Sequence, residues 1–98
     1  MRLHAEALSE IDQAFRYYEA EQLGLGHSFL AALEHGYGQI EDFPNARPLV
    51  EPEGRWYLLR KFPFAIVYIE DRGELVVMAV SHLSRRRDYW HQRLGRPA

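Results

Sequence analysis

Apolar residues in the first half of the chain recur at intervals of three and four, which predicts two amphipathic helices. The first, over residues 5–22, carries an apolar stripe of Leu8, Ile11, Phe15 and Tyr18. The second carries a stripe of Phe29, Leu30, Leu33, Tyr37 and Ile40. It should end before Phe43-Pro44, because proline disfavours helical backbone in the residue before it. The glycines of LGLG, residues 23–26, leave a connection that is short enough for an antiparallel hairpin.

Aromatic and β-branched residues predict strands after the polar, proline-containing segment 45–54. The three predicted strands are WYLLRKF (56–62), FAIVYIE (64–70) and LVVMAVSH (75–82), with a turn at 71–74. Residues 2–4 allow only a very short strand or an ordered lead-in. Both alternating faces of FAIVYIE are apolar, so this strand should be covered on both sides. The helix hairpin provides one cover, and a partner chain is a candidate for the other.

These elements predict an α+β fold, with the hairpin packed on a mainly antiparallel sheet of three to four strands. The 98 residues support one domain, 1–98, because a chain of this length cannot bury two cores. No apolar run approaches the roughly 20 residues that cross a membrane. The chain has no cysteine, and its first residues do not resemble a secretory signal. We therefore expect a cytoplasmic protein with no membrane partner.

Charge is segregated along the chain. Residues 1–54 hold three Arg and ten Asp or Glu, a balance of −7, whereas residues 55–98 hold nine Lys or Arg and four Asp or Glu, a balance of +5. The two balances sum to the net charge of −2. The second half should therefore attract anionic partners.

The positive charge is densest in SHLSRRRDYWHQR, residues 81–93. If residues 84–93 form a short helix, one side of it presents Arg86, Tyr89, Trp90 and Arg93. On that helix Arg85 would pair with Asp88. Guanidinium groups beside aromatic rings suit phosphate, bases or an acidic peptide. The alternative is that the rings cap the core and the arginines form a solvated face.

Basic residues also interrupt the first predicted strand, at Arg60 and Lys61, after Arg55. Neighbouring strand positions face opposite sides, so only one of Arg60 and Lys61 can join the arginine cluster. The alternative is that these charges protect a sheet edge from pairing with another chain. The carboxylates of the first helix are expected on an exposed face: Glu6, Glu10, Asp12 and Glu19.

The sequence gives little support for a metal site, a phosphate-binding loop or a catalytic nucleophile. The five histidines show no ligand spacing and no cysteine accompanies them, so we expect no metal and no cofactor. LGLG lies between helices and lacks the pattern of a phosphate-binding loop. Ser81 and His82 are neighbours on a strand and face away from each other, which argues against their acting as a nucleophile and its base.

In its order of elements and in several short stretches, the chain resembles the ParE/RelE superfamily of toxins from type II toxin–antitoxin systems. The resemblance runs from about residue 3 to residue 93 and is nearest to the ParE-like, plasmid-stabilisation branch. In the helices the matching positions are 7–12, Tyr17-Tyr18, Leu25-Gly26, Phe29, Ile40 and Phe43-Pro44. In the second half they are Arg55, Arg60, 62–64, 66–68, Ala79-Val80, His82, Arg86, Tyr89 and Trp90.

The resemblance implies one of two activities. RelE-like members cut messenger RNA on the ribosome without metal, using basic residues and a C-terminal tyrosine, whereas ParE-like members bind and poison DNA gyrase. The basic positions of the ribonuclease branch fall near Leu58, Arg60, Ala65 and Leu83, with Tyr89 at the tyrosine. Most of the required charge is missing, and the loss of one preorganised donor alone costs about 100- to 1000-fold in rate.

The resemblance therefore favours a bacterial ParE-like toxin that acts by binding, with DNA gyrase as its target and a cognate antitoxin as partner in a hetero-oligomer. A disordered antitoxin segment would fold over the hairpin and sheet and offer acidic residues to the arginines. Residues for target or antitoxin are Arg55, Arg60, Lys61, His82, Arg85, Arg86, Arg87, Tyr89, Trp90 and Arg93. One alternative is a ribosome-dependent endoribonuclease using Arg60, Arg85, Arg86 and Tyr89. Another is a non-toxic partner of the antitoxin.

Overall fold

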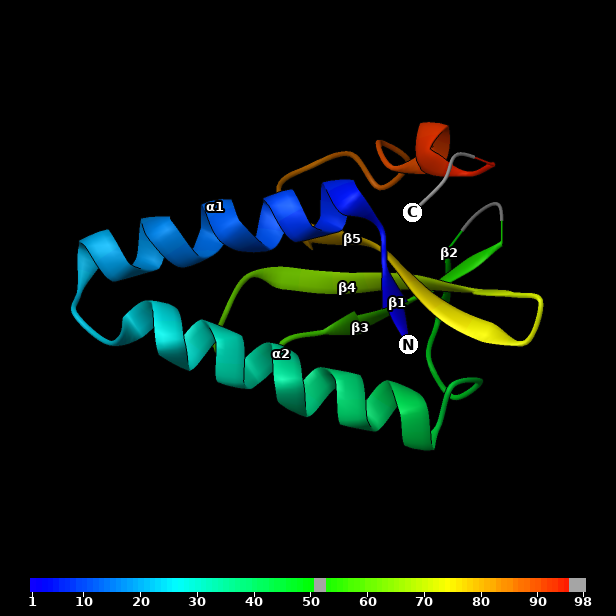
Figure 1. Cartoon of the computed structure of the whole chain (residues 1–98), viewed down its shortest axis with the longest axis horizontal. Coiled ribbons are helices and arrows are strands. Elements are labelled where there is room, and N and C mark those ends of the chain that lie inside the picture. Colours follow the sequence, from blue (N-terminus) through cyan, green and yellow to red (C-terminus); the bar gives the residue numbers. More distant parts are fainter. Residues whose placement is uncertain (51–52, 96–98) are drawn as a thin grey trace.

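Two helices and five strands make up the computed structural model, which describes residues 1–50 and 53–95. The strand β1 (Arg2–Leu3) precedes the helices α1 (Ala5–Glu21) and α2 (Leu25–Asp42). The remaining strands are β2 (Leu49–Val50), β3 (Gly54–Leu58), β4 (Phe64–Asp71) and β5 (Glu74–His82). Figure 1 shows the helices side by side, connected by a tight turn. The α+β fold and both predicted helices are confirmed.

The hairpin turn is closed by a side chain of α1. Gly24 takes a positive φ of 88°, which glycine adopts without steric cost. The Glu19 carboxylate accepts hydrogen bonds from the amides of Gly24 and Gly26, each at 2.9 Å. These bonds and the neighbouring His27 lower the pKa of Glu19, although its partial burial opposes the shift. Glu19 therefore has a structural role and does not belong to an unengaged polar face.

The sheet has five strands in the order β1-β5-β4-β3-β2, so the expected count of three to four was too low. β1 runs parallel to β5, and the other neighbours are antiparallel. The strand that sequence missed is β2, which lies in the segment expected to be a loop and is too short to show an alternating pattern. Residues 51–52 of that segment lie outside the described part of the chain.

The first predicted strand was too long at its C-terminal end. β3 ends at Leu58, and the backbone turns before β4, with Lys61 at a positive φ of 67°. Arg60 and Lys61 are therefore exposed in a loop, and the argument that they face opposite sides of a sheet does not apply to them.

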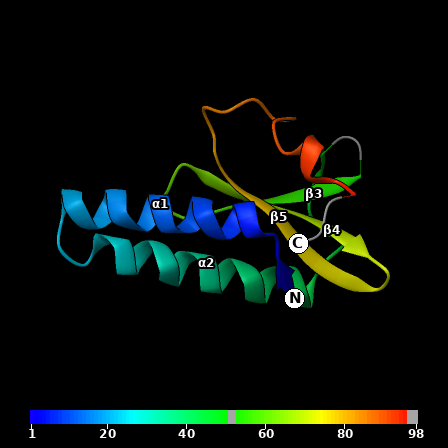
Figure 2. The same cartoon turned by 45° about the horizontal axis from the view of Figure 1, so that its top comes forward.

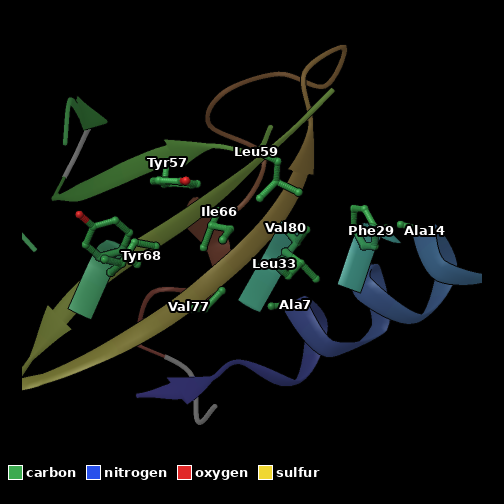
Figure 3. Close-up of a cluster of buried hydrophobic side chains, with 11 residues drawn as sticks. Ala7, Ala14, Phe29, Leu33, Tyr57, Leu59, Ile66, Tyr68, Val77 and Val80 are labelled. Carbon is green, nitrogen blue, oxygen red and sulfur yellow. The ribbon is translucent and has the colours of Figure 1, made fainter. Parts of the chain in front are cut away.

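One hydrophobic core lies between the helices and the sheet. Figure 3 shows Leu33 of α2 next to Val77 and Val80 of β5, and Phe29 of α2 next to Ala14 of α1. Ala7 and Ala14 are the buried residues of α1, whereas Leu8, expected on the apolar stripe, is 54% exposed. Small side chains allow α1 to approach the sheet closely, so the buried stripe is displaced by one position from the predicted one.

A second core lies on the opposite face of the sheet, and the chain itself covers it. The C-terminal segment, residues 83–95, folds back over this face, as Figure 2 shows. Trp90 is completely buried there, against Val67, Val76, Met78 and Ala79. The sequence suggested a partner chain as the cover, but the chain's own tryptophan fills this part of the face.

The predicted helix over residues 84–93 does not form. Turns occupy most of this stretch, and only His91–Arg93 make a short 3₁₀-helix. Ser84 binds the ring of His82 through its amide at 3.0 Å and its hydroxyl at 2.8 Å, which turns the chain away from β5. Because Trp90 and Arg93 are both drawn into the molecule, tertiary contacts override the local helical pattern.

Candidate functional site

The Glu10 carboxylate connects α1, β5 and the C-terminal segment. Its side chain is only 12% exposed, contrary to the expected polar face of α1. It accepts hydrogen bonds from the amide of Val80 at 3.0 Å and the hydroxyl of Tyr89 at 2.6 Å. The Arg93 guanidinium donates two more, at 3.0 and 2.9 Å. A charge buried this deeply needs such partners, and here each comes from a segment distant in sequence.

Arg93 is the buried partner of Glu10, with its side chain 6% exposed. It also donates to the carbonyl oxygen of Met78 at 2.8 Å, where the pairing of β4 and β5 shifts register. Burial alone lowers the pKa of Arg93, but the hydrogen bonds and charge of Glu10 outweigh it and raise the pKa above its usual value. Arg93 was expected on a binding surface, and the structure places it inside the fold.

Tyr89 lies at the edge of this network. Its ring is flanked by the guanidinium carbons of Arg85, 3.9 Å from the ring centre, and of Arg93, 5.0 Å away. Burial and then the hydrogen bond to Glu10 raise the pKa of Tyr89 to about 12. The tyrosine is half-buried and neutral at physiological pH, and its hydroxyl is engaged.

The four residues expected on one side of a C-terminal helix do not share one exposed surface, although Tyr89 and Arg93 are in contact. Arg86 is turned outward and forms an ion pair with Asp88 at 3.1 Å, whereas Trp90 is buried. Arg85 does not pair with Asp88, as the helix predicted, but lies 3.8 Å from Glu10. The exposed surface of arginines around two rings therefore does not exist in the predicted form.

The other basic candidates lie in different places. Arg55 donates to the backbone oxygen of Arg47 at 2.7 Å. Arg60 and Lys61 line a depression beside the start of α2, which Arg85 does not line. The endoribonuclease set therefore does not line one depression, and the Tyr89 hydroxyl donates a hydrogen bond to Glu10.

A groove runs between α1 and the ends of β4 and β5, and we call it the helix groove. It encloses about 540 Å³. Its lining is Glu10, Gln13, Ala14, Tyr17, Tyr18, Pro63, Phe64, Val80, His82 and Arg85. The wall includes the aromatic rings of Tyr18 and of Tyr17, which is 61% exposed. The charged side chains of the lining are Glu10 and Arg85, which lie 3.8 Å apart.

Sequence reasoning placed His82 and Arg85 among the candidates but missed the rest of this groove. Tyr18 was expected on the apolar stripe of the first helix and Phe64 in a strand, and with Tyr17 they also fell in stretches that match the family, but none was given a binding role. The available signal was the adjacent pair Tyr17-Tyr18, because the predicted stripe includes Tyr18 and leaves Tyr17 as an exposed aromatic residue. Glu10, which holds the tail, was taken for a solvated residue.

Within residues 1–50 and 53–95, no group of three or more His, Cys, Asp or Glu is arranged to hold a metal ion. Among the same residues, neither helix has the length and apolar character needed to cross a bilayer.

Comparisons with known proteins agree with this fold. No curated protein sequence matches the chain. A solved chain of the chromosomal ParDE TA system from P. aeruginosa superposes with a TM-score of 0.62 at 16% identity, over 83% of this chain and 91% of that one. At this identity the superposition supports the fold alone. The model of the ParE toxin family of the type II toxin–antitoxin system parDE matches residues 1–89, and the chain therefore belongs to this family.

Proposed function

We propose that this protein is the toxin of a type II toxin–antitoxin module, that it inhibits DNA gyrase, and that a cognate antitoxin neutralises it by binding in the helix groove. The helix groove is the observation that supports the antitoxin site. Its volume of about 540 Å³ lies within the range of about 300–1,000 Å³ typical of pockets that bury most of a ligand. A gyrase target implies action in the bacterial cytoplasm.

The lining of the groove suits a segment that folds on binding. Ala14, Tyr18 and Phe64 offer apolar surface for side chains that are exposed in a disordered segment. Arg85, with its side chain 53% exposed, lies at the charged part of the groove and offers a partner for an acidic residue. A segment that carries apolar side chains next to a carboxylate therefore matches the groove in shape and charge.

The ribonuclease alternative has less support. A phosphodiester cleaving site needs donors preorganised around one phosphate, and a tyrosine free to contact it. Arg86 is paired with Asp88, Arg60 lines a different depression from Arg85, and the Tyr89 hydroxyl donates to Glu10. We therefore propose inhibition by binding, with no reaction catalysed by the chain.

The proposal is tested with purified protein in a gyrase supercoiling assay, alone and with the product of the neighbouring gene. Supercoiling should be inhibited by the protein and restored by that product. Expression of the chain in cells should arrest growth, and co-expression of the neighbour should rescue it. Unaffected supercoiling at any protein concentration would exclude gyrase as the target, and absence of growth arrest would favour a non-toxic family member.

The groove itself is tested with Tyr17→Glu, because Tyr17 is exposed and its replacement should leave the fold intact. Loss of an interface aromatic typically costs about 2 kcal/mol or more, so antitoxin affinity should fall at least about 30-fold. Leu23→Glu is the matched control, since Leu23 is 90% exposed at the hairpin turn, away from the groove. Equal antitoxin affinities for the two variants would place the antitoxin elsewhere.

A further inference from the structure

The second face of the sheet is not completely covered by the C-terminal segment. Trp90 fills the part of this face over β4 and β5, and a groove of about 270 Å³ remains beside it, which we call the sheet groove. Its lining is Val50, Trp56, Leu58, Val67, Ser81, His82, Leu83, Arg85 and Arg87. This groove is on the opposite face of the sheet from the helices and is separate from the helix groove.

The charge of the sheet groove has one sign. Among the described residues that line it, two are arginines and none is a carboxylate. The Arg87 guanidinium lies 4.6 Å above the centre of the Trp56 ring, and Arg87 forms no ion pair within the described ranges 1–50 and 53–95. Its neighbour Arg86, by contrast, is paired with Asp88. Arg87 is therefore an exposed cation that stacks on the Trp56 ring and pairs with no carboxylate of the described residues.

The remaining lining is aliphatic. Leu58 is 54% exposed and Leu83 is 48% exposed, and both border the groove. Exposed aliphatic side chains next to Arg87 match a peptide that carries a carboxylate beside an aliphatic side chain. Single-stranded nucleic acid is less suited, because base stacking needs a free aromatic face and Arg87 occupies a face of Trp56.

We infer that the sheet groove is a second docking surface, which binds a protein segment carrying aliphatic and acidic side chains, with Arg87 as the main partner of a carboxylate. We assign that segment to the toxin's target, and only this assignment rests on the proposed function. Leucine side chains of the ligand contact Leu58 and Leu83, and the Trp56–Arg87 pair supplies the cation in a fixed position.

The two grooves share residues. His82 and Arg85 line both, so they form the ridge between the helix groove and the sheet groove. An antitoxin carboxylate that pairs with Arg85 in the helix groove withdraws that charge from the sheet groove. Binding in one groove should therefore lower the affinity of the other groove for its ligand. By thermodynamic linkage, each ligand lowers the affinity for the other by the same factor.

The inference is tested by titrating isotope-labelled protein with the blocked peptide acetyl-Glu-Leu-Asp-Leu-amide and following amide and indole NMR shifts. We expect saturable shifts at Trp56, Leu58 and Leu83. The isosteric acetyl-Gln-Leu-Asn-Leu-amide should bind at least about tenfold more weakly, because it lacks the charged acceptors. Arg87→Glu should reduce affinity for the acidic peptide by a similar factor, whereas Arg86→Glu, outside the groove, should leave it nearly unchanged.

Three results would overturn the inference: no saturable shift, equal affinity for the charged and neutral peptides, or an octathymidylate that binds the same residues more tightly than the acidic peptide. The titration involves neither gyrase nor antitoxin. A negative result would therefore leave the proposed function in place, and a failed supercoiling assay would leave the sheet groove intact.

Discussion

Replacement of Glu10 by glutamine should destabilise the fold more than any other single charge change on α1. The substitution preserves the shape of the side chain and one acceptor oxygen, so it tests the charge. It leaves the Arg93 guanidinium, 6% exposed, without its principal anion. Arg93 keeps the Met78 carbonyl, the one oxygen of the substituted side chain and the more distant Glu6 carboxylate, whose oxygen lies 3.8 Å from Nε.

The size of the effect follows from burial. At the 2.9 Å separation of Glu10 and Arg93, two unit charges attract by about 6 kcal/mol at an effective dielectric constant of about 20, and desolvation offsets most of this. Removal of one partner from a buried ion pair typically costs about 3–5 kcal/mol. Since glutamine keeps one acceptor, we expect a loss of about 3 kcal/mol, against a total stability of about 5–15 kcal/mol.

Urea unfolding followed by tryptophan fluorescence measures this loss, because Trp90 is completely buried beside the network. The midpoint should fall while the slope stays constant, since the native surface is unchanged. Asp12→Asn is the matched control on the same helix: Asp12 is 59% exposed and pairs with Arg16 at 2.9 Å, so its loss should cost no more than about 0.5 kcal/mol.

A double-mutant cycle with Arg93→Met separates the pair from its surroundings. The double variant should be more stable than the sum of the single losses predicts, by about 2 kcal/mol, because removal of both charges leaves neither buried alone. A loss below about 1 kcal/mol for Glu10→Gln, or a coupling energy near zero, would refute the view that this pair holds the C-terminal segment to the domain.

Two further predictions concern the hairpin. Glu19→Gln should lower stability at pH 7, and the difference from the wild type should vanish as the pH falls through the lowered pKa of Glu19. The reason is that a carboxyl group with a lowered pKa contributes stability only where it is charged. Urea midpoints at pH 7 and pH 3 check this, and a pH-independent difference would contradict it. Gly26→Ala should destabilise the protein despite the better helix propensity of alanine, because the added Cβ would lie 2.8 Å from the backbone oxygen of Phe15. Gly38→Ala, in the same helix with nothing within 4 Å of the added Cβ, should stabilise by up to about 1 kcal/mol, and thermal unfolding that ranks the two variants the other way would refute the close approach of the helices.

The elements that could be predicted from sequence are those whose pattern repeats over several turns or pairs. Both helices and the hairpin at Gly24 follow from apolar spacing and local backbone preference. Strand β2 could not be found this way, because its two residues pair with β3 only in the folded sheet. The end of β3 was misplaced because apolar residues lie on both sides of Arg60-Lys61 and hide the turn at Lys61.

The site was harder to predict from the sequence, because tertiary contacts decide which of its charged residues are buried and which are exposed. Glu10 lies three residues after Ala7 and four before Ala14, on the buried stripe of α1. Alanine gives a weak apolar signal, so Glu10 looked like a surface residue. Trp90 and Arg93 likewise matched a helical spacing at the surface, but both are needed inside, one as a hydrophobic cover and the other as the counterion of Glu10.

The segregation of charge along the chain finds part of its explanation in these contacts. The acidic first half supplies Glu10 and the basic second half supplies Arg93, so one arginine of the tail is neutralised within the fold. Arg86 is satisfied locally by Asp88. Among the described arginines of the tail, Arg87 on the Trp56 ring and Arg85 on the ridge between the two grooves remain for a partner. A cation on that ridge can contact a ligand in either groove, and the proposed coupling between the grooves depends on this placement.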